Sequence, residues 1–293
     1  MSSTGIGDTI VSIRFLRPGR PLPRLLALAL LGALIALASP FAGAADGERK
    51  LTPREAAELR YADRVMQRGF QRMAASQWKL ARKDFYDAIK SISFVNGEQD
   101  PRVAEIYVMS ARTRFTQAVQ GKGKPGPMTA AREEFDKAIA IYEALPAPHN
   151  EPLLDTYIQY GDLLQVASAH DAALEVYYKG WDMMVDRTSQ RAANDFFKRA
   201  TNLMDMAPNR GYRSSEDQIV WFTFDVDPQG RIADLEDKGS TAGKKLMHDM
   251  ERLLDRARFR PRFVDREPQS MRGFIKLRFP NDGSRPQDLP NGA

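Results

Sequence analysis

Hydrophobic residues recur every three or four positions across residues 52–209, which is the period of helices that bury one side. The pattern is interrupted at residues 96–97, 121–127 and 146–148, where glycine, asparagine and proline favour turns. The sequence therefore predicts a long all-helical segment, with the last helix ending near Ala207.

An internal repeat lies within this segment. An alanine, an aromatic residue four positions later and a small residue three positions after that occur at Ala81-Phe85-Ala88, Ala131-Phe135-Ala138 and Ala173-Tyr177-Gly180. Gly69 and Gly161 stand twelve residues before the first and third alanines. Small residues let two helices approach closely, while the aromatic ring fills space against a neighbouring hairpin. The repeat thus predicts stacked helical hairpins.

These positions resemble the tetratricopeptide repeat (TPR). The matching residues are Gly69, Trp78, Ala81, Phe85 and Ala88, followed by Gly161, Ala173, Tyr177 and Gly180. The alanines are 50 and then 42 residues apart, against about 34 in the family, so the repeats are degenerate. The resemblance implies a groove that binds a partner peptide or domain, and an ordinary helical bundle is the alternative interpretation.

The period changes to two after residue 211, which indicates β-strands. Val220, Phe222, Phe224 and Val226 alternate with polar or exposed positions, and residues 227–230 have the composition of a turn before a partner strand at 232–237. A helix is predicted from Ser240 or Thr241, as N-cap, to about Ala257. Its apolar face is formed by Leu246, Met250, Leu253 and Leu254.

Alternation returns after this helix. Phe259 and Phe263 alternate with arginines, and Ile275, Leu277 and Phe279 alternate with cations. We therefore expect one small antiparallel sheet with an apolar face covered by the helix. The predicted fold class is multidomain: an all-α, TPR-like helical repeat array followed by a small α+β domain.

This region is similar to the TonB C-terminal domain family. The resemblance rests on Asp227, Gly230-Arg231-Ile232, Gly239-Ser240, residues 258–261 and the final strand at 273–279. It implies a periplasmic module that contacts outer-membrane proteins and couples inner-membrane energy to transport. In the family's energy transducers a long proline-rich spacer precedes this module, whereas here a helical array occupies that position.

The N-terminal residues have the parts of an export signal: Arg14, Arg17, Arg20 and Arg24, then an uncharged run at 25–38, then Ala42-Gly43-Ala44. We expect cleavage after Ala44 or Ala45 and a periplasmic location. The uncharged run extends to Ala45, so an uncleaved inner-membrane anchor is the alternative. The predicted organisation is a signal peptide at 1–45, helical repeats at 46–210, the α+β domain at 211–280 and a flexible tail at 281–293.

The net charge of the chain adds little to these predictions. Of the formal net charge of +5, the four arginines and Asp8 contribute +3 within the first 44 residues, so nucleic-acid binding is weakly supported. The absence of cysteine excludes disulfides, thiolate metal sites and thiol catalysis.

Five cations near the C-terminus form the candidate partner-binding site: Arg258, Arg260, Arg262, Lys276 and Arg278. If the sheet buries the alternating apolar residues, these cations share its opposite face and would meet an acidic partner or anionic lipid. The alternative is a solvated face that discourages aggregation between sheet edges.

The sequence gives little support for a metal site or a catalytic site. Carboxylates at Asp225, Asp227 and Glu236 with Gly230 match the spacing of a calcium-binding EF-hand loop, but the preceding residues alternate like a strand, which favours a hairpin turn. His149, His170 and His248 are far apart in sequence and form no catalytic motif. We predict no catalytic residue, cofactor or metal.

These observations predict a non-enzymatic periplasmic adaptor whose partners are envelope proteins. These partners would be outer-membrane transporters or peptide segments bound by the repeats, and not nucleic acid. A membrane would be a partner only if the N-terminal helix were retained. The second hypothesis is a TonB-type energy transducer held in the inner membrane, and the third is an enzyme built on the helical scaffold.

Overall fold

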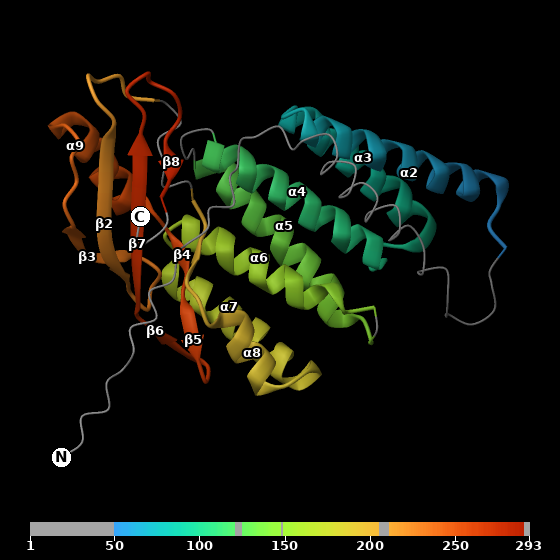
Figure 1. Cartoon of the computed structure of the whole chain (residues 1–293). Coiled ribbons are helices and arrows are strands. Elements are labelled where there is room, and N and C mark those ends of the chain that lie inside the picture. Colours follow the sequence, from blue (N-terminus) through green and yellow to red (C-terminus); the bar gives the residue numbers. More distant parts are fainter. Residues whose placement is uncertain (1–49, 121–124, 148, 205–210, 290–293) are drawn as a thin grey trace, which may run out of the picture.

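The computed structural model describes residues 50–120, 125–147, 149–204 and 211–289. Helices form its first part: α2 (Pro53–Ala74), α3 (Trp78–Asn96), α4 (Pro101–Gln120), α5 (Pro125–Ala144), α6 (Pro152–Val166), α7 (His170–Arg187) and α8 (Gln190–Phe197). Three hairpins, α2/α3, α4/α5 and α6/α7, lie side by side and are called here the helical array (Figure 1). The predicted export signal at 1–45 lies outside the described residues.

Local sequence signals explain the ends of several helices. Thr52 and Glu55 form a reciprocal capping box at the start of α2. Gly97, with a φ of 87°, ends α3, and a proline begins α5 and another begins α6. The predicted break at 96–97 lies at the end of α3, and the one at 146–148 follows the end of α5. The break predicted at 121–127 is only partly correct, since α5 already begins at Pro125 and residues 121–124 lie outside the described ranges. The predicted end near Ala207 is wrong, because α8 ends at Phe197.

The repeated aromatic residues pack inside the hairpins at the glycines. A Cβ added to Gly69 would lie 2.7 Å from Cε1 of Phe85, and one added to Gly161 would lie 2.4 Å from Cε1 of Tyr177. Both rings are fully buried. The close approach predicted for these glycines is confirmed, and each ring fills the space inside its own hairpin. Phe135 instead stacks at 5.3 Å on Tyr160 of the next hairpin.

The second part, called here the terminal module, runs from Thr201 to Leu289. Its main sheet has the order β3-β2-β7-β8, with β2 (Gln218–Val226), β3 (Ile232–Asp237), β7 (Met271–Phe279) and β8 (Gln287–Asp288). Helix α9 (Lys244–Arg256) packs Leu246, Met250 and Leu254 against the buried side chains of β2 and β7. The coarse fold class, a helical array followed by a small α+β domain, is confirmed.

Two short strand pairs lie outside this sheet. Strand β1 (Thr201–Asn202) pairs with β4 (Phe259–Arg260), and β5 (Arg262–Val264) pairs with β6 (Glu267–Gln269). The expectation that residues 258–263 belong to the main sheet is therefore wrong. Strand β1 lies before the predicted boundary at 210/211 and pairs with a strand that follows it. Strand β8 pairs with β7 opposite Leu277 and Arg278, so part of the predicted flexible tail is a strand.

The predicted N-cap of α9 is also wrong. The helix begins at Lys244 after Gly243, which makes no side-chain cap. The hydroxyls of Ser240 and Thr241 instead accept hydrogen bonds from the backbone N–H groups of Trp221 and Ile219, at 2.9 and 3.0 Å. These two hydroxyls satisfy backbone N–H groups of β2 beyond the end of β3, because a hydroxyl oxygen can replace a backbone carbonyl as acceptor. Within the described ranges, none of the helices is long and apolar enough to span a bilayer.

Candidate functional site

An ion pair joins the terminal module to the helical array. Arg260 of β4 donates from Nε to Oδ1 of Asp162 in α6 at 2.9 Å, and from Nη2 to Oδ2 at 2.7 Å. The Tyr177 hydroxyl donates to the same carboxylate at 2.8 Å. The side chains of Arg260 and Asp162 are only 14% and 17% exposed. Arg260 is thus an anchor between the two parts rather than a free cation.

The protonation states at this junction follow from burial and charge. Burial alone would lower the pKa of Arg260, but the Asp162 carboxylate outweighs it and raises that pKa. Burial is also the main cause that raises the pKa of Tyr177 well above its ordinary value. These raised pKa values keep Arg260 charged and Tyr177 neutral at pH 7.

Strands β5 and β6 form a hairpin that docks on the last helices. Phe263 of β5 belongs to the core of the array, not to that of the module. Its ring centroid lies 5.1 Å from that of Phe197, 5.8 Å from that of Tyr178 and 6.1 Å from those of Tyr177 and Trp181. A single alternating segment, Phe259 to Phe263, therefore contributes one ring to each core.

The tip of this hairpin is held by polar contacts. Asp265 and Arg266 both have positive φ, at 49° and 72°. Oδ1 of Asp265 accepts from Gln190 Nε2 at 2.8 Å and from Asn194 Nδ2 at 2.9 Å. Arg266 pairs with Asp182 at 2.8 Å. A shallow pocket of about 390 Å³ opens beside the tip, but Asp265 and Arg266 in its lining are already engaged by these contacts.

The turn between β2 and β3 docks on the end of α6. Nε2 of the buried Gln165 donates to the carbonyl oxygens of Gln229, at 2.5 Å, and Phe259, at 2.9 Å. Its Oε1 lies 2.8 Å from Nδ1 of His170, which must therefore donate. Gly230 has a φ of 74°, and a Cβ there would lie 2.1 Å from the Phe259 oxygen. Only glycine fits this contact.

The five predicted cations do not form one row. Arg258 donates to the carbonyl oxygens of Asp255 and Ala257, at 3.0 and 2.8 Å. The Nε of Arg262 is buried and has no hydrogen-bond partner. Lys276 lies 4.5 Å from the ring centroid of Trp221, and Arg278 pairs with Asp217. The expectation of a shared sheet face is wrong, because β4 and β5 leave the main sheet.

Strand β3 is the exposed edge of the main sheet, and the pattern of residues did not single it out. Its residues 234–237 are all exposed, and Leu235 presents an apolar side chain there. In the described part of the chain, β2 is the only strand that pairs with β3. A bulge at Asp234, with a φ of 49°, interrupts the pairing between Thr223 and Asp225. Figure 1 shows β3 on the side of the module that faces away from the array.

The candidate calcium loop is a β-hairpin. Strands β2 and β3 flank the turn, and Asp227 closes it by accepting from the backbone N–H groups of Gln229 and Arg231 at 2.9 and 2.8 Å. Asp225 pairs with Arg272 at 3.5 Å. The hairpin interpretation is confirmed, since an EF-hand loop requires helices on both sides. No cluster of three metal-ligating side chains occurs among the residues that the structure describes.

Comparison with known proteins does not assign the chain to a family. No protein-family model matches the chain. No curated protein sequence is significantly similar to it.

Proposed function

We propose that this protein is a non-enzymatic adaptor of the periplasm that binds an extended segment of an envelope protein at strand β3. The observation that carries the proposal is the exposed edge of β3. Unpaired backbone groups on an edge strand can accept a further strand, which gives affinity through main-chain hydrogen bonds. The resemblance of the module to TonB C-terminal domains supports an envelope partner, such as an outer-membrane transporter.

The docked geometry favours an adaptor over an energy transducer. Arg260, Phe263 and Gln165 hold the module against the third hairpin. A module fixed in this way cannot serve as the free end of an extended spacer, which gains about 3.1 Å per residue when proline-rich. The array then acts as a rigid support that leaves β3 accessible, and its TPR-like hairpins offer a second surface for peptide segments.

Site-specific photocrosslinking in cells tests this proposal. A photoreactive residue at Leu235 is expected to capture an envelope protein, and a peptide of the captured segment should compete for the purified protein. The matched control is the same residue at Arg252, which is exposed on α9. Equal capture at both positions, or a captured peptide that does not compete, would show that β3 is not the binding edge.

The intact mass of the protein recovered from cells separates the adaptor from a membrane-held transducer. Loss of residues up to Ala44 or Ala45 is expected for the adaptor, because cleavage removes the anchor on which force coupling depends. A full-length mass in the membrane fraction would favour the transducer.

A further inference from the structure

The first hairpin of the array separates its charges by exposure. Within residues 50–100 the exposed acidic residues are Asp63 and Glu98. The exposed basic residues are Lys50, Arg54, Arg60, Arg64, Arg68, Lys79, Lys83 and Lys90. The surface of this hairpin is therefore strongly basic, with eight exposed cations against two exposed carboxylates, whereas its whole sequence holds ten basic and seven acidic residues.

Two of the other acidic residues of this hairpin are engaged by polar side chains. Asp84 is buried and accepts hydrogen bonds from Arg68 at 2.7 Å and from Arg72 at 2.8 Å. Glu58 accepts from the buried Ser91 hydroxyl at 2.8 Å. Arg60 and Arg64, one helical turn apart on α2, point to solvent and enter no ion pair with a described residue.

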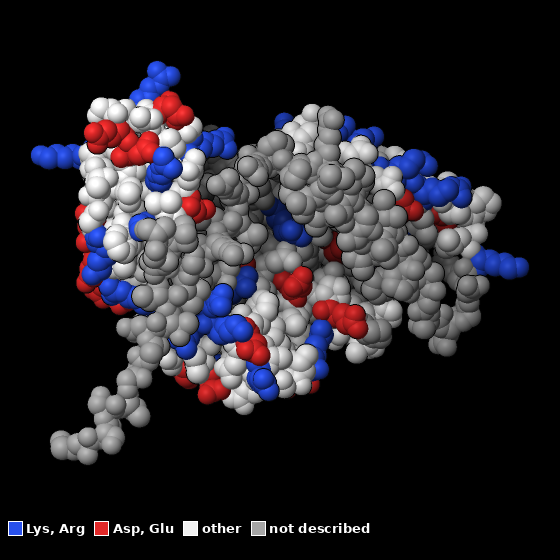
Figure 2. All heavy atoms as spheres, in the orientation of Figure 1, with Lys and Arg blue, Asp and Glu red and all other residues white. Residues whose placement is uncertain are grey.

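The third hairpin has the opposite character. In residues 151–188 the exposed basic residues are Lys179 and Arg187, whereas the exposed acidic residues are Glu151, Asp155, Asp171, Glu175, Asp182 and Asp186. Among the described residues, the excess of exposed cations thus lies on the first hairpin and not on the third. Figure 2 shows Lys and Arg side chains along the outer margin of the array, over α2.

Exposed apolar side chains accompany these cations. Four of the six large hydrophobic residues that are exposed in the described ranges belong to this end of the chain: Leu51, Tyr61, Leu80 and Phe94. Phe94 is 56% exposed, and Arg54 lies 5.1 Å from its ring centroid. Cations beside exposed aromatic and aliphatic groups suit the interface of an anionic bilayer, where apolar groups enter the acyl boundary and cations meet phosphate.

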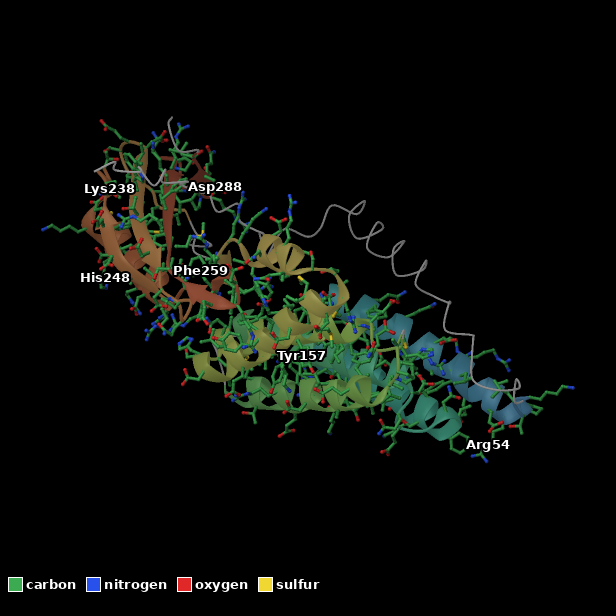
Figure 3. All side chains as sticks on the ribbon, turned by 90° about the horizontal axis from the view of Figure 1, so that it is seen from below. Arg54, Tyr157, Lys238, His248, Phe259 and Asp288 are labelled. Atoms are coloured by element: carbon green, nitrogen blue, oxygen red, sulfur yellow. The ribbon has the colours of Figure 1, made fainter. Side chains whose placement is uncertain are left out.

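We propose that the outer surface of α2 and α3 binds an anionic phospholipid membrane. Exposed cations supply the attraction, and Tyr61, Leu80 and Phe94 enter the headgroup region. Figure 3 places Arg54 at the end of the array opposite to Lys238 of the terminal module. Binding there would hold the array on the membrane with β3 directed away from it. The proposal stands on the first hairpin alone and does not depend on the function of β3.

Cosedimentation with lipid vesicles tests this surface. The protein recovered from cells is mixed with vesicles of phosphatidylcholine, or of phosphatidylcholine and phosphatidylglycerol, at ~0.1 M salt. We expect much stronger binding to the anionic vesicles, and loss of the difference at ~1 M salt, where charges are screened. An apolar N-terminal segment, if retained, would increase binding to both kinds of vesicle. The difference in binding between anionic and neutral vesicles therefore measures the contribution of charge.

Two double variants locate the binding surface. Arg60→Glu with Arg64→Glu should weaken binding to anionic vesicles by about tenfold or more, because each cation near such a surface contributes about 1 kcal/mol. Lys244→Glu with Lys245→Glu makes the same charge change on exposed positions of α9 and should leave binding unchanged. Circular dichroism confirms that both variants are folded.

Three outcomes would overturn the proposal. Equal binding to neutral and anionic vesicles would show that the basic surface has no role. Equal loss in the two double variants would show that net charge acts rather than this hairpin. Self-association that is abolished by the Arg60 and Arg64 changes, without vesicle binding, would show that the basic end meets the acidic third hairpin of a second copy.

Discussion

Arg260 and Asp162 form the bidentate ion pair that fastens the terminal module to the third hairpin. In the first hairpin the buried Asp84 is neutralised by arginines of α2, and in the second the buried Glu134 is neutralised by Arg114 of α4. Asp162 instead receives its cation from the module. The carboxylate of Asp162 is therefore paired with an arginine only when the module is docked on the third hairpin.

Arg260→Ala should lower the free energy of unfolding by about 3 kcal/mol, because Asp162 is left poorly solvated without its partner. Urea unfolding followed by circular dichroism measures the change. Arg278→Ala removes an exposed pair with Asp217 that is screened by solvent, and should lower the free energy of unfolding much less. Equal effects of the two substitutions would contradict the anchoring role of Arg260.

Gly161→Ala should destabilise the array by about 1–3 kcal/mol, since its Cβ would overlap the buried Tyr177 ring and force the helices apart. The control is Gly243→Ala, where the nearest atom, Oε1 of Gln218, lies 3.5 Å from the new Cβ. Thermal unfolding compares the two. A stable Gly161→Ala protein would mean that α6 and α7 can separate without loss of packing.

Phe263→Ala should lower the free energy of unfolding by about 3–5 kcal/mol, and the destabilisation should affect the array more than the main sheet. Hydrogen exchange is expected to rise in α7 and α8, where the ring packs, more than in β2 and β7. Phe279→Ala, in the core of the module, should give the reverse distribution. Increased exchange in the main sheet of the Phe263 variant would contradict its assignment to the array.

The stability of the junction should fall as the pH is lowered through about 6.5, the ordinary pKa of histidine. Burial lowers the pKa of His170, and the nearby Arg258 and Arg231 lower it further. The unfolded chain then binds a proton more readily than the folded protein, so this contribution is complete above that pH and declines below it. Urea unfolding between about pH 7.5 and 5.5 measures the slope.

His170→Asn should reduce this slope, because the titrating imidazole is removed. The asparagine amide nitrogen takes the place of Nδ1 and can still donate to Gln165, so the variant removes the titration and keeps the hydrogen bond. An unaltered slope in the His170 variant would show that other groups carry the pH dependence.

The helical hairpins and the main strands could be predicted because their signals are local. The three-to-four-residue period of α2 to α7, the glycines opposite Phe85 and Tyr177, and the alternation along β2 each act within one or two neighbouring elements. The turn at Asp227 to Gly230 could also be predicted, since its side-chain hydrogen bonds span only a few residues. Apolar periodicity therefore determined which residues are buried and which element contains them.

Only the tertiary structure decided which core receives each buried residue. Phe259 and Phe263 are equivalent in the sequence pattern, yet they enter different cores, because β4 and β5 leave the main sheet at the junction. Arg260 resembles any strand cation until Asp162, 98 residues away, is placed beside it. The exposure of β3 and the partition of charge between the hairpins also depend on long-range packing. Periodicity gives the direction of a side chain, but not the partner that meets it.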